Sequence, residues 1–300
     1  MSAAGAMARA SDGPRRPFGA LGATLSMIKF QHTVFALPFA LSAALLAAGG
    51  MPPWPTLGWI LGAMVGARSA AMVFNRIVDR ELDRMNPRTA TRPLVTGELG
   101  LPFAWAFLAA SLALFFLSAA MLNRLALLLA TPVIVVLLSY SFAKRVTWLA
   151  HLHLGASLGL APLGAWVAVT GRIEAAPLLL GAGVMLWVGG FDVLYACQDA
   201  DFDRGAGLHA IPARFGIPRA LVIARALHFL AVVAWFGFGA VLALGYFWYV
   251  GVSVAALLLA WEHTLVRADD LRRVNQAFFT MNGVISFLIL AATIGEVASR

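Results

Sequence analysis

The feature of this sequence that most constrains its fold is a succession of long apolar runs, each bounded by glycine, proline or charged residues. A helix needs about 20 apolar residues to cross the hydrocarbon core of a bilayer. By that measure the sequence predicts nine spans, which begin near residues 24, 56, 103, 125, 150, 175, 220, 246 and 274. Composition agrees, because 61% of the residues are hydrophobic and only 12% are charged. Since soluble domains carry about 25% charged residues, we expect an all-α integral membrane protein.

The connections between the predicted spans alternate in length and charge. One set is short and nearly uncharged: residues 49–56, 123–124, 171–177 and 243–248. The other set is long or basic: residues 76–102, 143–148, 199–219 and 262–273. Because basic loops stay in the cytoplasm, we expect the N-terminus and the second set to face the cytoplasm, in the inner membrane of a bacterium or archaeon.

The N-terminal 20 residues carry three arginines and have no apolar core of signal-peptide length. They predict a mobile cytoplasmic tail over residues 1–20, followed by one transmembrane domain over residues 21–300. The formal charge of +8 indicates orientation in such a chain, so we expect no nucleic-acid partner. The single cysteine, Cys197, excludes an internal disulfide and a cysteine-rich metal cluster.

Acidic residues follow one apolar run at a regular spacing, in the stretch "NRIVDRELDRMNPR". Asn75, Asp79 and Asp83 are four residues apart, and each step of four turns an α-helix by only about 40° beyond a full turn. All three side chains should therefore lie on one helical face, while Glu81 points elsewhere.

A second acidic stretch repeats the first, with Asp199 and Asp203 each displaced by 120 residues from Asp79 and Asp83. Four spans separate the two stretches, so both should emerge on the same side of the membrane. We expect two related four-helix halves and a final helix around a central cavity, with the acids at the interface between the halves.

Within the second stretch, Asp192, Asp199 and Asp203 share a helical face with Tyr195, and Asp201 lies opposite. Asp192 falls inside an apolar span, where a charged side chain costs at least about 2.5 kcal/mol unless it faces a partner or a wet cavity. That cost indicates a function for Asp192.

Carboxylates gathered at this density repel one another unless a cation lies between them. Oxygen ligands alone, without histidine or cysteine at matching spacing, favour Mg²⁺ over zinc or copper. Magnesium is commonly shared between one or two carboxylates and substrate phosphates, which predicts a bound diphosphate with Arg88, Arg92 and Lys144 near it. The opposing interpretation is a set of ordinary ion pairs on a helix surface, such as Arg76 with Asp79.

The remaining charged residues have simpler expected roles. We expect lipid headgroups to hold one set of arginines: Arg84, Arg145, Arg219, Arg272 and Arg273. The histidines at 151, 153, 228 and 263 are expected to be packed or at helix ends. Lys29 and His32 fit either an interfacial anchor or a pocket.

These motifs together resemble the UbiA superfamily of intramembrane prenyltransferases, in particular its 4-hydroxybenzoate polyprenyltransferase-like members, over residues 24–297. The first stretch is similar to the family's Asn-xxx-Asp-xxx-Asp motif, and the second to its Asp-xxx-Asp motif. "SYSFAKR", with Tyr140 and Lys144, resembles its Tyr-xxx-Lys element, and "KFQHTVFALPF" its opening helix. Many relatives have aspartate where this chain has Arg76, whose role stays open.

The resemblance implies Mg²⁺-dependent transfer of a polyprenyl chain from its diphosphate to an aromatic quinone precursor, within surrounding membrane lipids. The implied metal ligands are Asn75, Asp79, Asp83, Asp192, Asp199 and Asp203. The implied substrate contacts are Arg88, Arg92, Tyr140, Lys144 and Tyr195. The implied catalytic groups are Asp79, Asp192, Asp199 and Lys144.

The acceptor expected from the resemblance is 4-hydroxybenzoate, with a dihydroxynaphthoate of menaquinone synthesis as the alternative. A different class of protein, an ion-coupled transporter, also uses intramembrane acids between repeats. A transporter predicts acids near the midplane with access from both faces, whereas these acids lie at helix ends.

Overall fold

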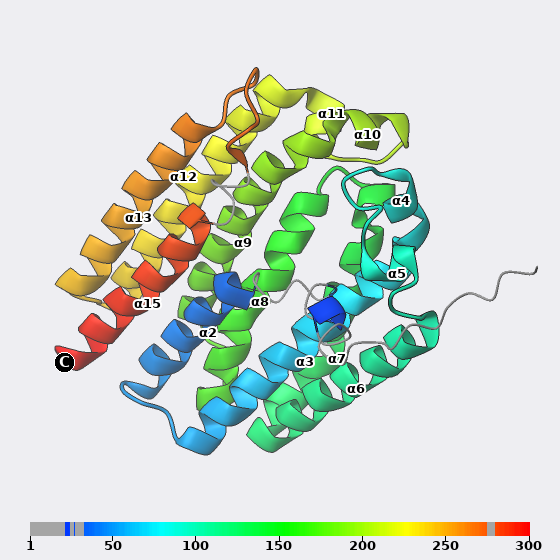
Figure 1. The fold of residues 1–300 in the computed structure, drawn as a ribbon. Coiled ribbons are helices and arrows are strands. Elements are labelled where there is room, and N and C mark those ends of the chain that lie inside the picture. The colour runs from blue at the N-terminus through cyan, green and yellow to red at the C-terminus, as the bar shows by residue number, and fades with distance from the viewer. Residues whose placement is uncertain (1–21, 25–26, 28–32, 275–279) are drawn as a thin grey trace, which may run out of the picture.

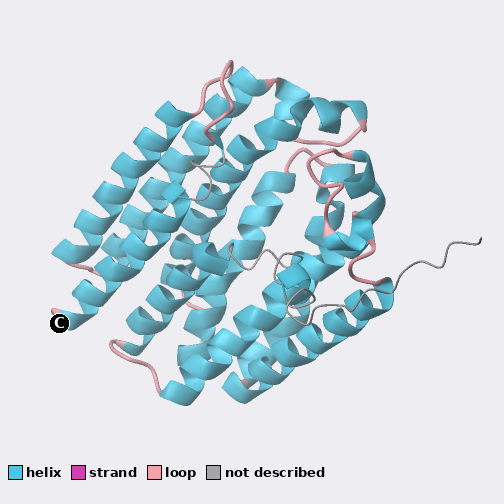
Figure 2. Ribbon diagram, in the orientation of Figure 1, coloured by secondary structure: helices cyan, strands magenta, loops and turns pink. Residues whose placement is uncertain are grey.

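The computed structural model of the chain describes residues 22–24, 27, 33–274 and 280–300. Figure 2 shows helices joined by loops, and the described residues contain no strand. The long helices are α2 (Thr33–Ala48), α3 (Trp54–Val78), α6 (Leu101–Leu122), α7 (Arg124–Val146), α8 (Ala150–Thr170), α9 (Ala175–Ala196), α12 (Ile217–Val241), α13 (Tyr246–Leu265) and α15 (Asn282–Ala298). The short ones are α4 (Arg80–Met85), α5 (Pro93–Thr96), η2 (Cys197–Asp199), α10 (Ala200–Gly205) and α11 (Ile211–Phe215).

Six helical segments in the described part of the chain are long and apolar enough to cross a bilayer. They are α3, α6, α7, α8, α12 and the segment from α9 to the end of α10. Helices α2 and α15 are apolar but shorter. Large apolar side chains such as Leu128, Phe229 and Leu257 are exposed on the outside, as expected for a surface that contacts lipid. The protein is therefore a multi-pass membrane protein, and the count of nine spans stays a prediction.

The helices pack in two groups. Helices α3, α6 and α7 contact one another and share one apolar cluster. Helices α8, α9, α12, α13 and α15 form the second group, and α2 joins it by packing against α8 and α15. Helix α2 thus lies among the helices of the predicted second half, and the layout of two four-helix repeats stays a prediction. So do the domain boundaries, and the predicted tail, Lys29 and His32 lie outside the described residues.

Helices α8 and α9 approach each other closely through glycine. A Cβ atom at Gly155 would lie 2.1 Å from the carbonyl oxygen of Met185, and one at Gly159 would lie 2.5 Å from that of Gly181. Any larger residue would push the two backbones apart, as in other membrane helix pairs packed through small residues. This contact fixes the position of α9, which carries Asp192, relative to α8.

The short helices gather at one end of the bundle. Figure 1 shows α4 and α5 beside α10 and α11, at the end where α3 and α9 finish. The two acidic stretches therefore lie on the same side of the fold, as their separation by four predicted spans requires.

Candidate active site

The first acidic stretch continues the line of helix α3 into a cavity. Helix α3 ends at Val78 and α4 begins at Arg80, with Asp79 as the residue between them. The spacing of four survives this break, because the Asp79 N–H donates to the Asn75 carbonyl at 2.9 Å and the Asp83 N–H donates to the Asp79 carbonyl at 2.7 Å. Asn75, Asp79 and Asp83 all line the cavity, so the predicted shared face is present.

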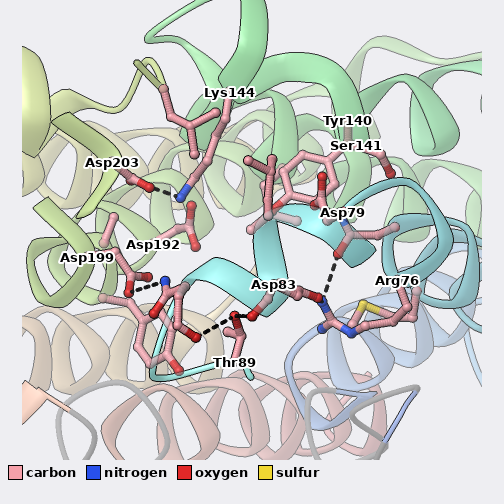
Figure 3. A pocket seen from close by; sticks show the side chains of 18 of the residues that line it. Arg76, Asp79, Asp83, Thr89, Tyr140, Ser141, Lys144, Asp192, Asp199 and Asp203 are labelled. Carbon is pink, nitrogen blue, oxygen red and sulfur yellow. Dashed lines mark hydrogen bonds and ion pairs between the residues drawn. The ribbon is translucent and has the colours of Figure 1, made fainter. Parts of the chain in front are cut away.

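The second stretch lines the same cavity from the opposite side. Asp192 and Tyr195 lie on α9, Asp199 ends η2 and Asp203 lies on α10. Figure 3 shows the carboxylates of the two stretches around one space. The two acids predicted to point away do so, since the side chains of Glu81 and Asp201 are 69% and 99% exposed.

The cavity has a charged part and an apolar part. Its volume is about 220 Å³. The charged part is formed by the acids and the basic side chains that pair with them. The apolar part is lined by Phe35, Leu154, Leu158, Val188 and Phe191. A ligand with an anionic head and a hydrocarbon tail matches this division.

Each of four acids pairs with a basic side chain. The pairs, with their N–O distances, are Asp79 with Arg145 (2.9 Å), Asp83 with Arg92 (2.5 Å), Asp199 with Arg88 (2.6 Å) and Asp203 with Lys144 (3.3 Å). The surface ion pairs considered from the sequence are not what forms, because these partners come from other helices and loops. The acids therefore face cations across the cavity.

Arg88 joins the two acidic stretches. It is the last residue of the first stretch, yet its Nε and Nη2 atoms donate to the two carboxylate oxygens of Asp199 at 2.8 and 2.6 Å. Its Nη1 donates to the Tyr195 hydroxyl at 3.1 Å, and Asn86 also donates to Asp199. Burial alone would lower the pKa of Arg88, but the hydrogen bond and charge of Asp199 raise it above its usual value. The guanidinium is therefore a permanent cation in the cavity wall.

At Asp79 the effect of burial is larger than that of the ion pair. Its pKa is raised above the usual value because burial disfavours the charged carboxylate by more than the hydrogen bond and charge of Arg145 favour it. Asn75 donates a second hydrogen bond to Asp79 at 2.7 Å. An additional cation beside Asp79 would stabilise its ionised form.

Asp192 has a different kind of partner. Its Oδ2 lies 2.6 Å from Nδ1 of His151, a fully buried residue of α8. The sequence predicted His151 to be packed or at a helix end, which describes its location but misses its contact with Asp192. No periodic pattern indicates this pair, because the two residues are 41 positions apart.

Several cavity residues were not identified from the sequence. Arg145 was expected at lipid headgroups, but its Nη2 donates to Asp79 and to the Val78 carbonyl, both at 2.9 Å. The expectation was wrong because the end of α7 lies beside the end of α3, within reach of a long side chain. Arg68 belongs to none of the motifs but interrupts an apolar run and lines the cavity, and the cost of an arginine there is the same signal that identified Asp192.

The cavity also contains other polar residues from the loops and helix ends. Asn86 binds Asp199, and the Thr89 hydroxyl donates to the Asp83 carbonyl at 3.0 Å. The predicted substrate contacts Arg92, Tyr140 and Lys144 all line the space. The predicted metal ligands and substrate contacts thus line one cavity.

The predicted metal ligands line one cavity without forming a ready-made cage. Among the described residues, no group of three or more His, Cys, Asp or Glu side chains is arranged to hold a metal ion. Magnesium needs no such cage when it is bound through one or two carboxylates and the phosphates of its substrate. The oxygen-only donors therefore fit a magnesium ion that arrives with a diphosphate.

Comparison with known sequences places the chain among prenyltransferases. The model of the UbiA prenyltransferase family matches residues 36–284. A 4-hydroxybenzoate octaprenyltransferase of Saccharophagus degradans is 32% identical over 245 residues, covering 81% of this chain and 82% of the relative. One of Xanthomonas euvesicatoria is 35% identical over 242 residues, covering 80% and 79%.

Solved structures agree with this fold. The apo structure of a UbiA homolog from Aeropyrum pernix K1 is 39% identical with a TM-score of 0.80, covering 88% of this chain and 97% of that one. A UbiA homolog from Archaeoglobus fulgidus bound to DMAPP and Mg²⁺ is 21% identical with a TM-score of 0.71, covering 93% and 100%. With its fold, its paired acidic motifs and these likenesses in agreement, the chain belongs to the UbiA prenyltransferase family.

Proposed function

We propose that the protein transfers a polyprenyl chain from its diphosphate to 4-hydroxybenzoate, with Mg²⁺, in quinone biosynthesis. The observation that carries this proposal is the cavity itself, where acids and cations from two distant stretches meet beside an apolar wall. Relatives that match about four fifths of the chain are 4-hydroxybenzoate octaprenyltransferases, which favours this acceptor over a dihydroxynaphthoate. The clustering of the acids at one end of the bundle argues against a transporter.

The diphosphate end of the substrate fits the charged part of the cavity. The residues proposed to hold magnesium are Asn75, Asp79, Asp83, Asp199 and Asp203, while Asp192, which the resemblance also implied as a ligand, is proposed to serve the acceptor instead. Magnesium, when bound, neutralises negative charge on the departing diphosphate. Arg88, Arg92 and Lys144 are within reach to donate hydrogen bonds to the phosphate oxygens, because each already binds a cavity carboxylate. Preorganised donors of this kind stabilise charge that develops on a leaving group.

The apolar part of the cavity fits the prenyl chain and the allylic cation that remains when diphosphate departs. Phe35, Phe191 and Val188 present hydrocarbon and aromatic surfaces there. Such walls exclude water, which would otherwise capture the cation, and aromatic faces attract positive charge. The tail can extend between helices toward lipid without entering water.

The acceptor needs a cation for its carboxylate and a group near its ring. Arg68 lines the cavity from the middle of α3, deeper than the acidic motif, and we assign it to the carboxylate. Asp192 also lines the cavity from within α9, and we assign it to the acceptor hydroxyl or to removal of the ring proton. Tyr140 lines the same cavity.

From the positions of the basic loops we infer that this site faces the cytoplasm, as does the N-terminus. The test of the function is an incubation of the purified protein in liposomes with radiolabelled prenyl diphosphate, Mg²⁺ and either aromatic acid. We expect label in a prenylated 4-hydroxybenzoate. Transfer to the dihydroxynaphthoate alone would replace the acceptor, and transfer to neither would refute the proposal.

A further inference from the structure

We propose that His151 is a positioning residue, which fixes the orientation of Asp192 and joins it to the backbone of the segment 208–211. Its ring makes one contact on each side. Nδ1 lies 2.6 Å from Oδ2 of Asp192, and Nε2 lies 3.3 Å from the backbone nitrogen of Ile211. The His151 ring is fully buried.

These two contacts define where the ring proton lies. A backbone N–H can only donate, so Nε2 of His151 must accept the hydrogen bond from Ile211. A neutral imidazole that accepts at one nitrogen donates at the other, so the proton is on Nδ1 and points to Asp192. A doubly protonated ring would set an N–H group against the Ile211 N–H. The structure thus assigns His151 as the neutral Nδ1–H tautomer.

This arrangement differs from that of the other acids in the cavity. Asp79, Asp83, Asp199 and Asp203 each lie within 4.0 Å of an arginine or lysine nitrogen. The ion pairs among the described residues include none between Asp192 and an arginine or lysine, only the contact with His151. A neutral donor orients a carboxyl group without placing a positive charge beside it. His151 contacts Oδ2 of Asp192, so the other carboxylate oxygen, Oδ1, can face the cavity that Asp192 lines.

The second contact couples Asp192 to the cavity wall. Leu208 lines the cavity, the His209 N–H donates to the Lys144 carbonyl at 2.6 Å, and Ile211 begins α11. The segment is thereby held against the end of α7 on one side and against His151 on the other. The glycine-mediated approach of α8 and α9 fixes the remaining distance, from His151 to Asp192. The position of Asp192 and the position of this wall are thus set by one side chain.

Two substitutions separate the two contacts. In His151→Asn the amide nitrogen can take the place of Nδ1 and keep the donor to Asp192, while the acceptor for Ile211 is lost. In His151→Gln the amide oxygen can reach the place of Nε2 and keep the acceptor for Ile211, while the donor to Asp192 is lost. If His151 had a purely structural role, the Asn and Gln variants would have similar turnover rates.

The kinetic test rests on the proposed prenyl transfer and uses the purified protein in liposomes. We expect His151→Gln to lower kcat by about 10- to 100-fold, as for other residues that orient a functional side chain, with little change in the KM for prenyl diphosphate. His151→Asn should retain most of kcat and lose thermal stability. His228→Gln, at a buried histidine bonded to the Trp187 carbonyl away from the cavity, is the control and should affect stability alone. Equal kcat values for the Gln and Asn variants would overturn the inference.

A second measurement needs no substrate. In protein labelled with ¹⁵N-histidine, NMR correlations through the ring should show His151 as the Nδ1–H tautomer, and its signals should shift in Asp192→Asn. A protonated Nε2 would contradict the inference even in an active protein. If the wild type fails to prenylate any acceptor while the Nδ1–H tautomer is found, the proposed function fails and the contact with Asp192 stands.

Discussion

The charged end of the cavity and its deeper wall hold their carboxylates in different ways. At the helix ends, Asp199 is bound by both arms of the Arg88 guanidinium, and the neighbouring acids also have cationic partners. Deeper in α9, Asp192 has a fully buried histidine as its partner. Cationic partners can move from a carboxylate to a phosphate when a ligand arrives. A buried histidine, tied to the backbone on its other side, cannot. The comparison indicates an exchangeable region for the diphosphate and a fixed region for the acceptor.

The largest effect should come from removing an acid of the exchangeable region. Asp79→Ala and Asp199→Ala should each lower kcat by about 100-fold or more, because each removes a group that acts on the charge of the leaving diphosphate. Glu81→Ala and Asp201→Ala, at exposed acids of the same two stretches, should retain most of the activity. The measurement is turnover per inserted protein, and a similar loss in all four variants would contradict the assignment of faces.

Removal of magnesium should affect the same region. Chelation should abolish transfer, and added Mg²⁺ should restore it, because the oxygen-only donors favour a hard cation. Zn²⁺ should restore much less, since it is bound best by sulfur and nitrogen ligands. Activity that persists in a chelator would show that the acids act only through their ion pairs with the basic residues and bind no metal.

Removing a cation from the deeper wall should weaken binding of the acceptor. Arg68→Leu should raise the KM for 4-hydroxybenzoate by about tenfold or more, because it removes the charge-assisted hydrogen bonds expected for the carboxylate. The KM for prenyl diphosphate should change little, since Arg68 lies deeper in α3 than the acidic motif. Steady-state kinetics with each substrate varied in turn would show this split, and an equal rise in both KM values would contradict the division into two regions.

A smaller effect is expected for Arg88→Lys. Lysine keeps the charge but not the two-pronged contact with Asp199, so the KM for prenyl diphosphate should rise by several-fold, up to about tenfold. Arg84→Lys is the matched control, because Arg84 pairs with Glu81 at the surface and not in the cavity. Indistinguishable kinetics in the two variants would show that the geometry of the Arg88 contact is unimportant.

The contrast between the two regions also shows what the sequence could predict. Regular spacing identified Asn75, Asp79 and Asp83, because a helix converts spacing of four into a shared face. The repeat at Asp199 and Asp203 then predicted that two distant stretches meet. Both features are local or periodic, and both survive the break in the helix at Asp79.

The missed residues depend on contacts between helices. Arg145 binds Asp79 because α7 and α3 end side by side, and His151 binds Asp192 because α8 and α9 are separated only by glycine. Neither contact leaves a periodic pattern in one chain. Arg68 does carry a signal in the sequence, because an arginine inside an apolar run is costly wherever it packs.

The central claim is that the two acidic stretches form one site for magnesium and diphosphate, and binding measures this most directly. Purified wild type, Asp79→Ala and Asp199→Ala can be titrated by calorimetry with an unreactive thiolo analogue of prenyl diphosphate in the presence of Mg²⁺. We expect one binding site in the wild type, and Mg²⁺-dependent affinity that is lost in both variants. Full retention of Mg²⁺-dependent binding in either variant would contradict a site shared between the two stretches.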